Sequence, residues 1–120
     1  VLAAIALDAA KLLDAKGITA RVESFHTVKP LDEARLAEVF AAYPVVATIE
    51  EHSKIGGLGG AVAEWLATQD GLRGKLLSFG TDDAFMREIG STQYARIKFG
   101  LTAENIASTV AARLKSRRAA

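Results

Sequence analysis

The stretch from Val45 to Trp65, VVATIEEHSKIGGLGGAVAEW, constrains the fold of this chain more than any other. It opens with a short apolar run rich in β-branched residues, which is typical of a strand buried on both faces of a parallel sheet. From Leu58 onward the apolar residues recur at helical spacing. Polar residues and glycines join the two parts. This order predicts an α/β protein that presents functional groups at the carboxyl edge of its sheet.

Similar signals elsewhere in the chain predict alternating helices and strands. Residues 18–25 (ITARVESF) alternate as a strand does, with 18, 20, 22 and 24 on one side and 19, 21, 23 and 25 on the other. Residues 84–101 lack a clean period and predict short helical turns, and the tail SRRAA is expected to fray. The expected helices are 1–16 with Gly17 as its stop, a helix up to residue 43 that follows Asp32 as its N-cap, 58–69, and 103–115 with Thr102 as its cap. Ile106, Val110 and Leu114 form the expected inner side of the last helix. The expected strands are 18–25, 45–49 and 75–79.

This alternation predicts a three-layer α/β/α sandwich on a mostly parallel sheet. At 120 residues we expect a single domain over 1–120. The first helix begins at residue 1 with neither a cap nor a preceding strand, although a helix start leaves N–H groups that need partners. We therefore expect the numbered chain to be a fragment that starts inside its domain.

Composition excludes several classes of function. Fifteen Lys and Arg against fourteen Asp and Glu leave a net charge of +1, which offers no case for nucleic acid. The absence of cysteine removes disulfides, thiolate metal sites and a cysteine nucleophile, and it fits a cytoplasmic protein. The apolar start is broken by Asp8 and Lys11 and is too short and too charged to span a membrane.

The glycine loop between strand and helix has two interpretations. Glycines there let a phosphate approach the backbone at a helix N-terminus. The spacing does not match the dinucleotide fingerprint, and no G-K-[ST] follows. The preferred interpretation is tight turning and close packing against another chain. The four glycines are Gly56, Gly57, Gly59 and Gly60.

Three polar residues, Glu50, Glu51 and His52, follow the same strand, where a catalytic acid or base is often placed. No nucleophile accompanies them. A metal site would need further ligands, and His26 would join them only if its strand were a neighbour. We interpret these four residues as a polar cluster that orders the loop or meets a partner, and not as catalytic, cofactor-binding or metal-binding groups.

Three blocks in this order and spacing resemble the C-terminal domain of transketolase, and most closely the form in which that enzyme is split into two chains. The blocks are RVESFHTVKPLDEARL (21–36), VVATIEEHSKIGGLGGAVAEWL (45–66) and KFGLTAENIASTVAARL (98–114). The resemblance implies a five-stranded mixed sheet whose first strand is antiparallel to the rest. That strand would precede residue 1.

The resemblance also implies a function for the complete enzyme. Transketolases use thiamine diphosphate and Mg²⁺ to transfer a two-carbon ketol unit between sugar phosphates. In that family the pyrimidine-binding and diphosphate-binding domains hold the cofactor, whereas the C-terminal domain helps to form the dimer and supports the other two. We therefore expect this chain to be inactive alone and to work in a homodimer or heterotetramer, with neither nucleic acid nor membrane as a partner.

Other functions remain open at this point. The same domain is shared by 1-deoxyxylulose-5-phosphate synthase and the beta subunits of 2-oxo-acid dehydrogenases. The blocks HTVKPLD and GLTAENI nevertheless favour transketolase. A different class of function would be a stand-alone module that binds a phosphate or nucleotide at the Gly56–Gly60 loop. An anionic effector at that loop of a complete enzyme is a third possibility.

Overall fold

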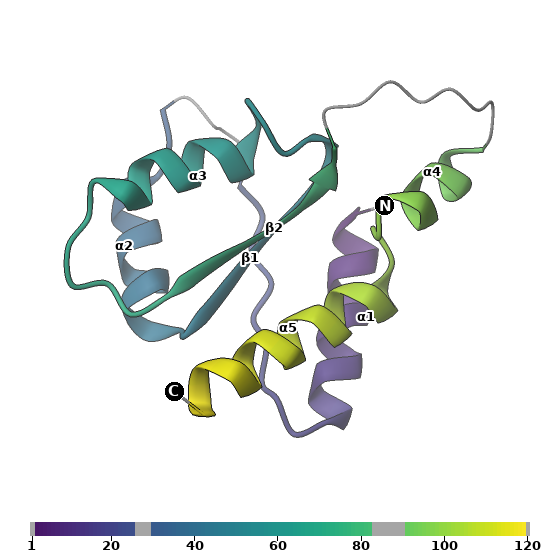
Figure 1. The fold of residues 1–120 in the computed structure, drawn as a ribbon, viewed down its shortest axis with the longest axis horizontal. Helices are drawn as coiled ribbons and strands as arrows, with labels where there is room; N and C mark the ends of the chain where they lie inside the picture. Colours follow the sequence, from purple (N-terminus) through teal and green to yellow (C-terminus); the bar gives the residue numbers. More distant parts are fainter. Residues whose placement is uncertain (1, 26–29, 83–90, 120) are drawn as a thin grey trace.

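The computed structural model describes residues 2–25, 30–82 and 91–119. In these residues helices cover both faces of a small sheet (Figure 1). In chain order the elements are α1 (Leu2–Ala15), α2 (Glu33–Ala42), β1 (Val45–Ser53), α3 (Leu58–Ala67), β2 (Lys75–Thr81), α4 (Thr92–Lys98) and α5 (Ala103–Ala119). Helices α2 and α3 pack on one face, and α1 and α5 pack on the other. The predicted layered α/β fold is thus confirmed.

The strands β1 and β2 run parallel, with Val45 opposite Lys75 and Ile49 opposite Phe79. After Ile49 the pairing becomes irregular before it resumes at Ser53 and Thr81. The connection between these parallel strands is α3, as a crossover requires.

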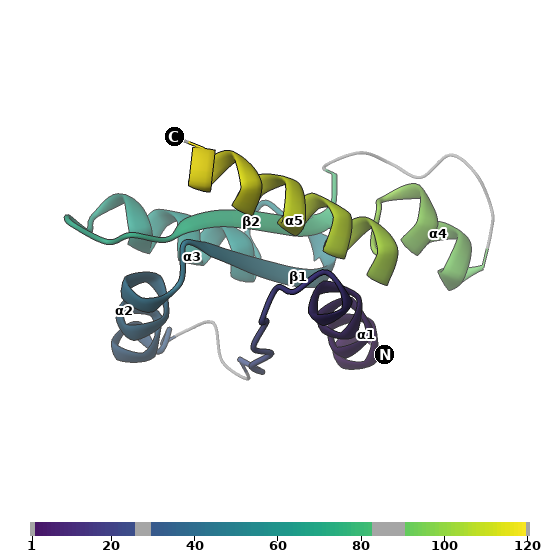
Figure 2. The ribbon, with the colours of Figure 1, turned by 90° about the horizontal axis from the view of Figure 1, so that it is seen from below.

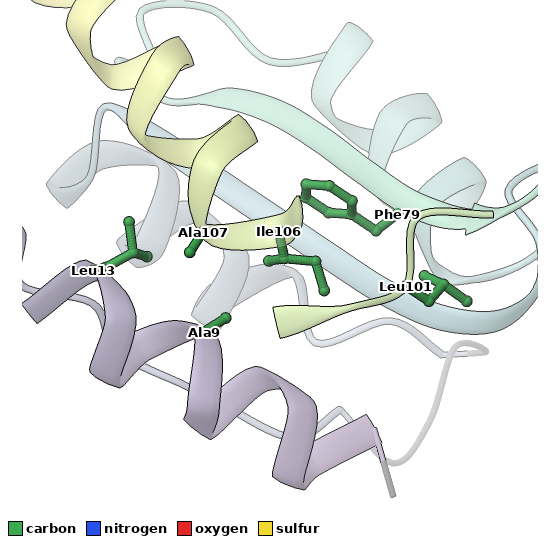
Figure 3. Packing of buried hydrophobic residues seen from close by; sticks show 6 residues of the cluster. All are labelled: Ala9, Leu13, Phe79, Leu101, Ile106 and Ala107. Atoms are coloured by element: carbon green, nitrogen blue, oxygen red, sulfur yellow. The ribbon is translucent and has the colours of Figure 1, made fainter. Parts of the chain in front are cut away.

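The core beneath α1 and α5 is built from aliphatic side chains and one aromatic ring. Ala9 and Leu13 of α1 face Ile106 and Ala107 of α5, and Phe79 reaches them from β2 (Figure 3). All of these side chains are buried. The predicted inner side of the last helix is confirmed at Ile106.

A second core lies between the sheet, α2 and α3. Phe40 is fully buried, and its ring centroid is 5.9 Å from that of Trp65, with the rings tilted by 54°. Leu36 and Val62 complete the buried set. Each such side chain contributes about 1.5–3 kcal/mol through burial of its apolar surface.

Local signals placed three of the helix ends correctly. Asp32 caps α2, because its side chain accepts a hydrogen bond from the backbone N–H of Arg35 at 3.1 Å. Thr102 likewise accepts from the N–H of Asn105 before α5. Gly17 follows α1 with φ of +77°, the left-handed conformation that commonly ends a helix at glycine.

One predicted strand is absent, and another ends later than predicted. Residues 18–25 form no strand, because their backbone makes no ladder with β1 despite the alternating side chains. The described residues accordingly contain a two-stranded sheet rather than the five strands that the resemblance implied. The strand expected at 45–49 continues to Ser53, so Glu50, Glu51 and His52 lie within β1 and not after it.

The C-terminal part also differs from the expectation. The tail does not fray at residue 116, because α5 continues to Ala119 and Arg117 donates a hydrogen bond to the carbonyl of Arg73 at 2.7 Å. Of the region 84–101, residues 84–90 lie outside the described residues, and α4 supplies the expected helical turn at Thr92–Lys98. None of the helices described has the length and apolarity needed to cross a membrane.

Candidate functional site

The carboxyl end of β1 and the glycine loop after it form the candidate site. Successive side chains of a strand point to opposite faces, and this alternation separates the two glutamates. Glu50 points to the face covered by α3 and is only 5% exposed, whereas Glu51 is exposed. The two carboxylates therefore do not act as a pair.

Glu50 binds the first turn of α3. Its Oε1 accepts a hydrogen bond from the N–H of Leu58 at 3.0 Å, and its Oε2 accepts one from the N–H of Gly59 at 2.7 Å. A helix N-terminus carries unpaired N–H groups and a partial positive charge, so a buried carboxylate is stabilised there. A phosphate would need the same two amides. The carboxylate of Glu50 therefore already occupies the position at the glycine loop where a phosphate would bind.

Gly59 allows α3 to approach the sheet closely. A Cβ at this position would lie 2.9 Å from Oγ of Ser78, 3.0 Å from Oε2 of Glu50 and 3.1 Å from Oγ1 of Thr48. Real Cβ atoms are not found at the shortest of these distances, so only glycine fits without a shift of its neighbours. Close packing at Gly59 is therefore present within the chain itself, whereas the packing against another chain stays a prediction.

The other three glycines contribute unequally to the turn. Gly56 has φ of +81°, which side-chain-bearing residues rarely adopt. Gly57 is buried and precedes α3 with an extended conformation, and its carbonyl accepts from the N–H of Ala61 at 3.0 Å. A Cβ on Gly60 would lie 3.3 Å from the carbonyl oxygen of Lys54. The turn thus needs glycine for its geometry at Gly56 and for space at Gly59.

Two ion pairs surround the loop on the solvent side. Glu51 binds Arg96 of α4, which attaches that helix to the end of β1. Lys54 lies 2.9 Å from Asp82, next to the end of β2. Sequence reasoning missed Arg96, because it lies 45 residues from its partner and no local pattern marks it. The adjacent Ile55 is 73% exposed.

A buried hydroxyl lies beside this cluster. Thr48 is 8% exposed, and its Oγ1 has no hydrogen-bond partner among the described residues. Sequence reasoning missed Thr48 and Ser78 as well, since each reads as an ordinary strand position. The signal that could have found them is the register of two parallel strands, which brings Thr48 opposite Ser78.

Two predicted site residues are not tested. His26 and the side chain of His52 lie outside the described part of the structure. Within that part, no group of three or more His, Asp or Glu side chains could hold a metal ion.

The site therefore defines a layered α/β domain in which a strand-end carboxylate fixes a glycine loop and the helix after it. Residues 2–106 match the family described as the transketolase C-terminal domain, and the chain belongs to that family. The fold class and the resemblance drawn from the sequence are both confirmed.

Three relatives illustrate the range of the family. The chain is 42% identical over 106 residues to the 6-deoxy-6-sulfo-D-fructose transketolase subunit SqwH of Clostridium sp. (strain MSTE9), covering 88% of this chain and 32% of that protein. It is 38% identical over 104 residues to the 1-deoxy-D-xylulose-5-phosphate synthase of Shewanella amazonensis, covering 87% and 16%. A solved split-gene transketolase, an inactive beta4 tetramer, superposes with a TM-score of 0.82 at 39% identity, covering 95% and 36%.

The chain spans about a third or less of the length of these relatives. It corresponds to one part of each of them.

Proposed function

We propose that this chain is the supporting and assembly domain of a thiamine diphosphate-dependent transketolase, in which it spans one domain over residues 1–120. The complete enzyme transfers a two-carbon ketol unit between sugar phosphates in the cytoplasm. This chain contributes no catalytic group. The proposal is supported by the family match together with the share of a transketolase subunit that the chain covers.

The carboxylate of Glu50 is the observation that carries the supporting role. It occupies the two amides of α3 that a diphosphate would need, so the only glycine-rich helix start in the described residues does not fit the cofactor. We therefore assign thiamine diphosphate and Mg²⁺ to the pyrimidine-binding and diphosphate-binding parts of the enzyme.

The partners that we propose are those parts of the same enzyme, in a homodimer or a heterotetramer. The split-gene transketolase with a similar fold is a tetramer of one chain type, which supports assembly through a chain of this kind. The surface that we assign to this contact comprises Glu51 at the end of β1 and Ile55 on the glycine loop, since both are exposed and Glu51 forms an ion pair with Arg96.

A second candidate is the corresponding domain of 1-deoxyxylulose-5-phosphate synthase. The 38% identity to a synthase of that kind favours it almost as strongly as the identity to a transketolase subunit favours the first. Both candidates assign the same supporting role to the chain and differ in the reaction of the complete enzyme.

Reconstitution of activity tests the proposal. The chain alone is compared with the chain joined to the remaining parts of its enzyme, in the presence of thiamine diphosphate and Mg²⁺. We expect ketol transfer between sugar phosphates only in the completed assembly. Formation of 1-deoxyxylulose 5-phosphate instead would select the second candidate.

Phosphate binding by the lone chain tests the alternative from a different class. Titration of the chain with inorganic phosphate and with a nucleotide is expected to show no saturable binding. Saturable binding that is lost in Gly57→Val or Gly59→Val, with the variants still folded, would contradict the supporting role.

A further inference from the structure

One dipeptide in this chain is chemically labile. The sequence contains a single Asp-Gly pair, Asp70-Gly71, and no Asn-Gly. In an Asp-Gly pair the backbone nitrogen of the glycine can attack the side-chain carboxyl carbon of the aspartate, because glycine has no Cβ that obstructs the approach. The resulting ring, a succinimide, opens to either aspartate or isoaspartate. Local structure determines how readily this ring forms in a folded protein.

The Asp-Gly pair lies in the connection between α3 and β2, at the outer edge of the molecule (Figure 2). Both residues are exposed and belong to neither a helix nor a strand. Gly71 has φ of +74°, and beyond its chain neighbours no heavy atom lies within 4 Å of the place where a Cβ on it would be. A succinimide ring and an attacking water molecule therefore have room here.

Neither of the two reacting groups is bound to a partner. In the part of the chain that the structure describes, the carboxylate of Asp70 forms no hydrogen bond or ion pair, and the backbone N–H of Gly71 forms no hydrogen bond. Backbone N–H groups inside helices and sheets are bound to carbonyls, which restrains the nitrogen that would attack. The nitrogen of Gly71 can instead turn toward Asp70 without the loss of a hydrogen bond.

The connection is fixed on both sides of the Asp-Gly pair but not at the pair itself. On the side of α3, the N–H of Gln69 donates to the carbonyl of Leu66 at 3.0 Å. On the side of β2, the N–H of Gly74 donates to the carbonyl of Phe40 at 2.7 Å, and Leu72 packs against the core of α2 and α3. Rearrangement of residues 70 and 71 breaks none of these contacts, so local opening there costs little free energy.

We propose that Asp70 is a site of spontaneous isoaspartate formation in the folded chain. The nitrogen of Gly71 bonds to Cγ of Asp70, and the carboxyl hydroxyl leaves as water together with the amide proton. Water then opens the succinimide. Cleavage of the new bond between the nitrogen and Cγ restores aspartate. Cleavage of the bond between the nitrogen and the backbone carbonyl carbon instead directs the main chain through Cβ and Cγ, which leaves a free carboxylate on Cα.

The partner that this product fits is a methyltransferase that uses S-adenosylmethionine and recognises isoaspartyl carboxylates. The exposed connection presents the new α-carboxylate to solvent. A methyl group passes from the sulfonium to a carboxylate oxygen, and S-adenosylhomocysteine leaves. Attack of the nitrogen of Gly71 on the ester then regenerates the succinimide and releases methanol, so that aspartate can be recovered.

Prolonged incubation of the full chain at neutral pH, in buffer and in guanidinium chloride, tests the proposal. Electron-transfer fragmentation of the peptide that contains residue 70 measures isoaspartate there. We expect the rate of its formation in the folded chain to lie within about tenfold of that in the denatured chain, because opening of an unanchored loop costs little free energy. A folded-chain rate below this range would show that the fold protects Asp70 and would overturn the proposal. Asp8, exposed but inside α1, is the internal control, and equal formation at Asp8 would equally contradict the role of the loop.

Methyl transfer to the incubated, folded chain tests the partner. A protein isoaspartyl methyltransferase with labelled S-adenosylmethionine is expected to label the parent chain. Asp70→Glu keeps the charge at this exposed position but cannot form isoaspartate, so it should lose nearly all of the label while its circular dichroism stays unchanged. Retention of most of the label in Asp70→Glu would place the reactive residue elsewhere and contradict the proposal. Isoaspartate that fragmentation detects at residue 70 but that the folded chain does not expose to methylation would overturn the assignment of the partner.

Discussion

At the scale of single residues, Glu50 has the strongest structural role in the candidate site. Replacement by Gln leaves one oxygen as an acceptor and turns an NH₂ group toward a backbone N–H. We expect Glu50→Gln to lower the free energy of unfolding by about 2 kcal/mol, the usual cost of an unsatisfied buried group. Thermal unfolding followed by circular dichroism measures this loss.

The control for Glu50 is Glu51→Gln in the neighbouring exposed ion pair. It should cost less than about 1 kcal/mol, as exposed ion pairs do. If both variants lost the same stability, the contact of Glu50 with α3 would not support the loop as we infer.

Gly59 provides the second prediction at this scale. We expect Gly59→Val to lower the free energy of unfolding by about 2–3 kcal/mol, because the new side chain meets Ser78, Glu50 and Thr48 at close range. Ala63→Val, at an exposed position of the same helix, should cost only about 0.5 kcal/mol through helix propensity. Equal losses in urea denaturation would show that propensity, not packing, determines the effect.

His52 belongs to the same strand end, and the supporting role predicts a modest effect of its removal. In the complete enzyme His52→Ala should reduce kcat by less than about tenfold, whereas loss of a general acid or base costs about 100- to 10,000-fold. Steady-state kinetics at a fixed oligomeric state measure this difference. A loss of the larger size with intact assembly would make His52 a catalytic residue.

At the scale of elements, features within a few residues were predictable and contacts across the sheet were not. The caps at Asp32 and Thr102 and the helix end at Gly17 depend on neighbours within four residues, so local patterns were enough. The pairing of a strand depends on a distant partner. Alternation at 18–25 predicted which side chains face which core, but it could not show whether the backbone joins β1.

The candidate site divides in the same way. The glycine loop and the position of Glu50 at the end of an apolar run were visible in the sequence. The role of Glu50 could not be predicted, because its carboxylate binds the first amides of α3, which begin eight residues further along the chain. The contact of Arg96 could not be predicted either, because only tertiary packing brings α4 next to β1.

The attachment of residues 18–25 to α2 has a pH dependence. Hydrogen bonds from Arg35 hold the pKa of Glu23 below its usual value. Because the pKa is lower in the folded chain than in the unfolded chain, this contact stabilises fully above the unfolded pKa and is lost as pH falls through the folded value. We expect the fall in Tm between pH 6 and pH 3 to be smaller in Glu23→Gln than in the parent chain. Glu64→Gln, an exposed change on α3, should leave the fall unchanged.

An equal fall in Tm for the parent chain and Glu23→Gln would contradict this assignment. Scanning calorimetry at the two pH values is the appropriate measurement, since it also reports whether unfolding stays reversible in acid.

At the scale of the whole molecule, several large apolar side chains remain on the surface. Ile55 on the glycine loop and Ile97 on α4 are 73% and 60% exposed, and both belong to segments next to the Glu51–Arg96 ion pair. Exposed apolar groups near one end of a domain are typical of a contact surface. This supports the surface that we assign to the other parts of the enzyme.

The assembly surface yields the last prediction. Ile55→Ser should weaken assembly of the complete enzyme by about tenfold, the effect of removing about 1.4 kcal/mol of apolar contact, while leaving the Tm of the chain unchanged. Analytical ultracentrifugation of the complete enzyme measures the change. Lys75→Ser, exposed at the opposite end of the sheet, is the control and should assemble as the parent does. Normal assembly of Ile55→Ser would exclude the loop from the interface.

The division of the interior into two cores has a consequence for how this domain can change over time. The cluster around Leu13 and the cluster around Trp65 share no buried side chain and are separated by the sheet. Substitutions that share no partner usually have additive effects on stability. A compensating change in one core therefore need not be matched in the other. Substitutions in the core beneath α1 and α5 can accumulate without disturbing the core beneath α2 and α3, which positions the glycine loop. The two sides of this small domain can therefore evolve at different rates.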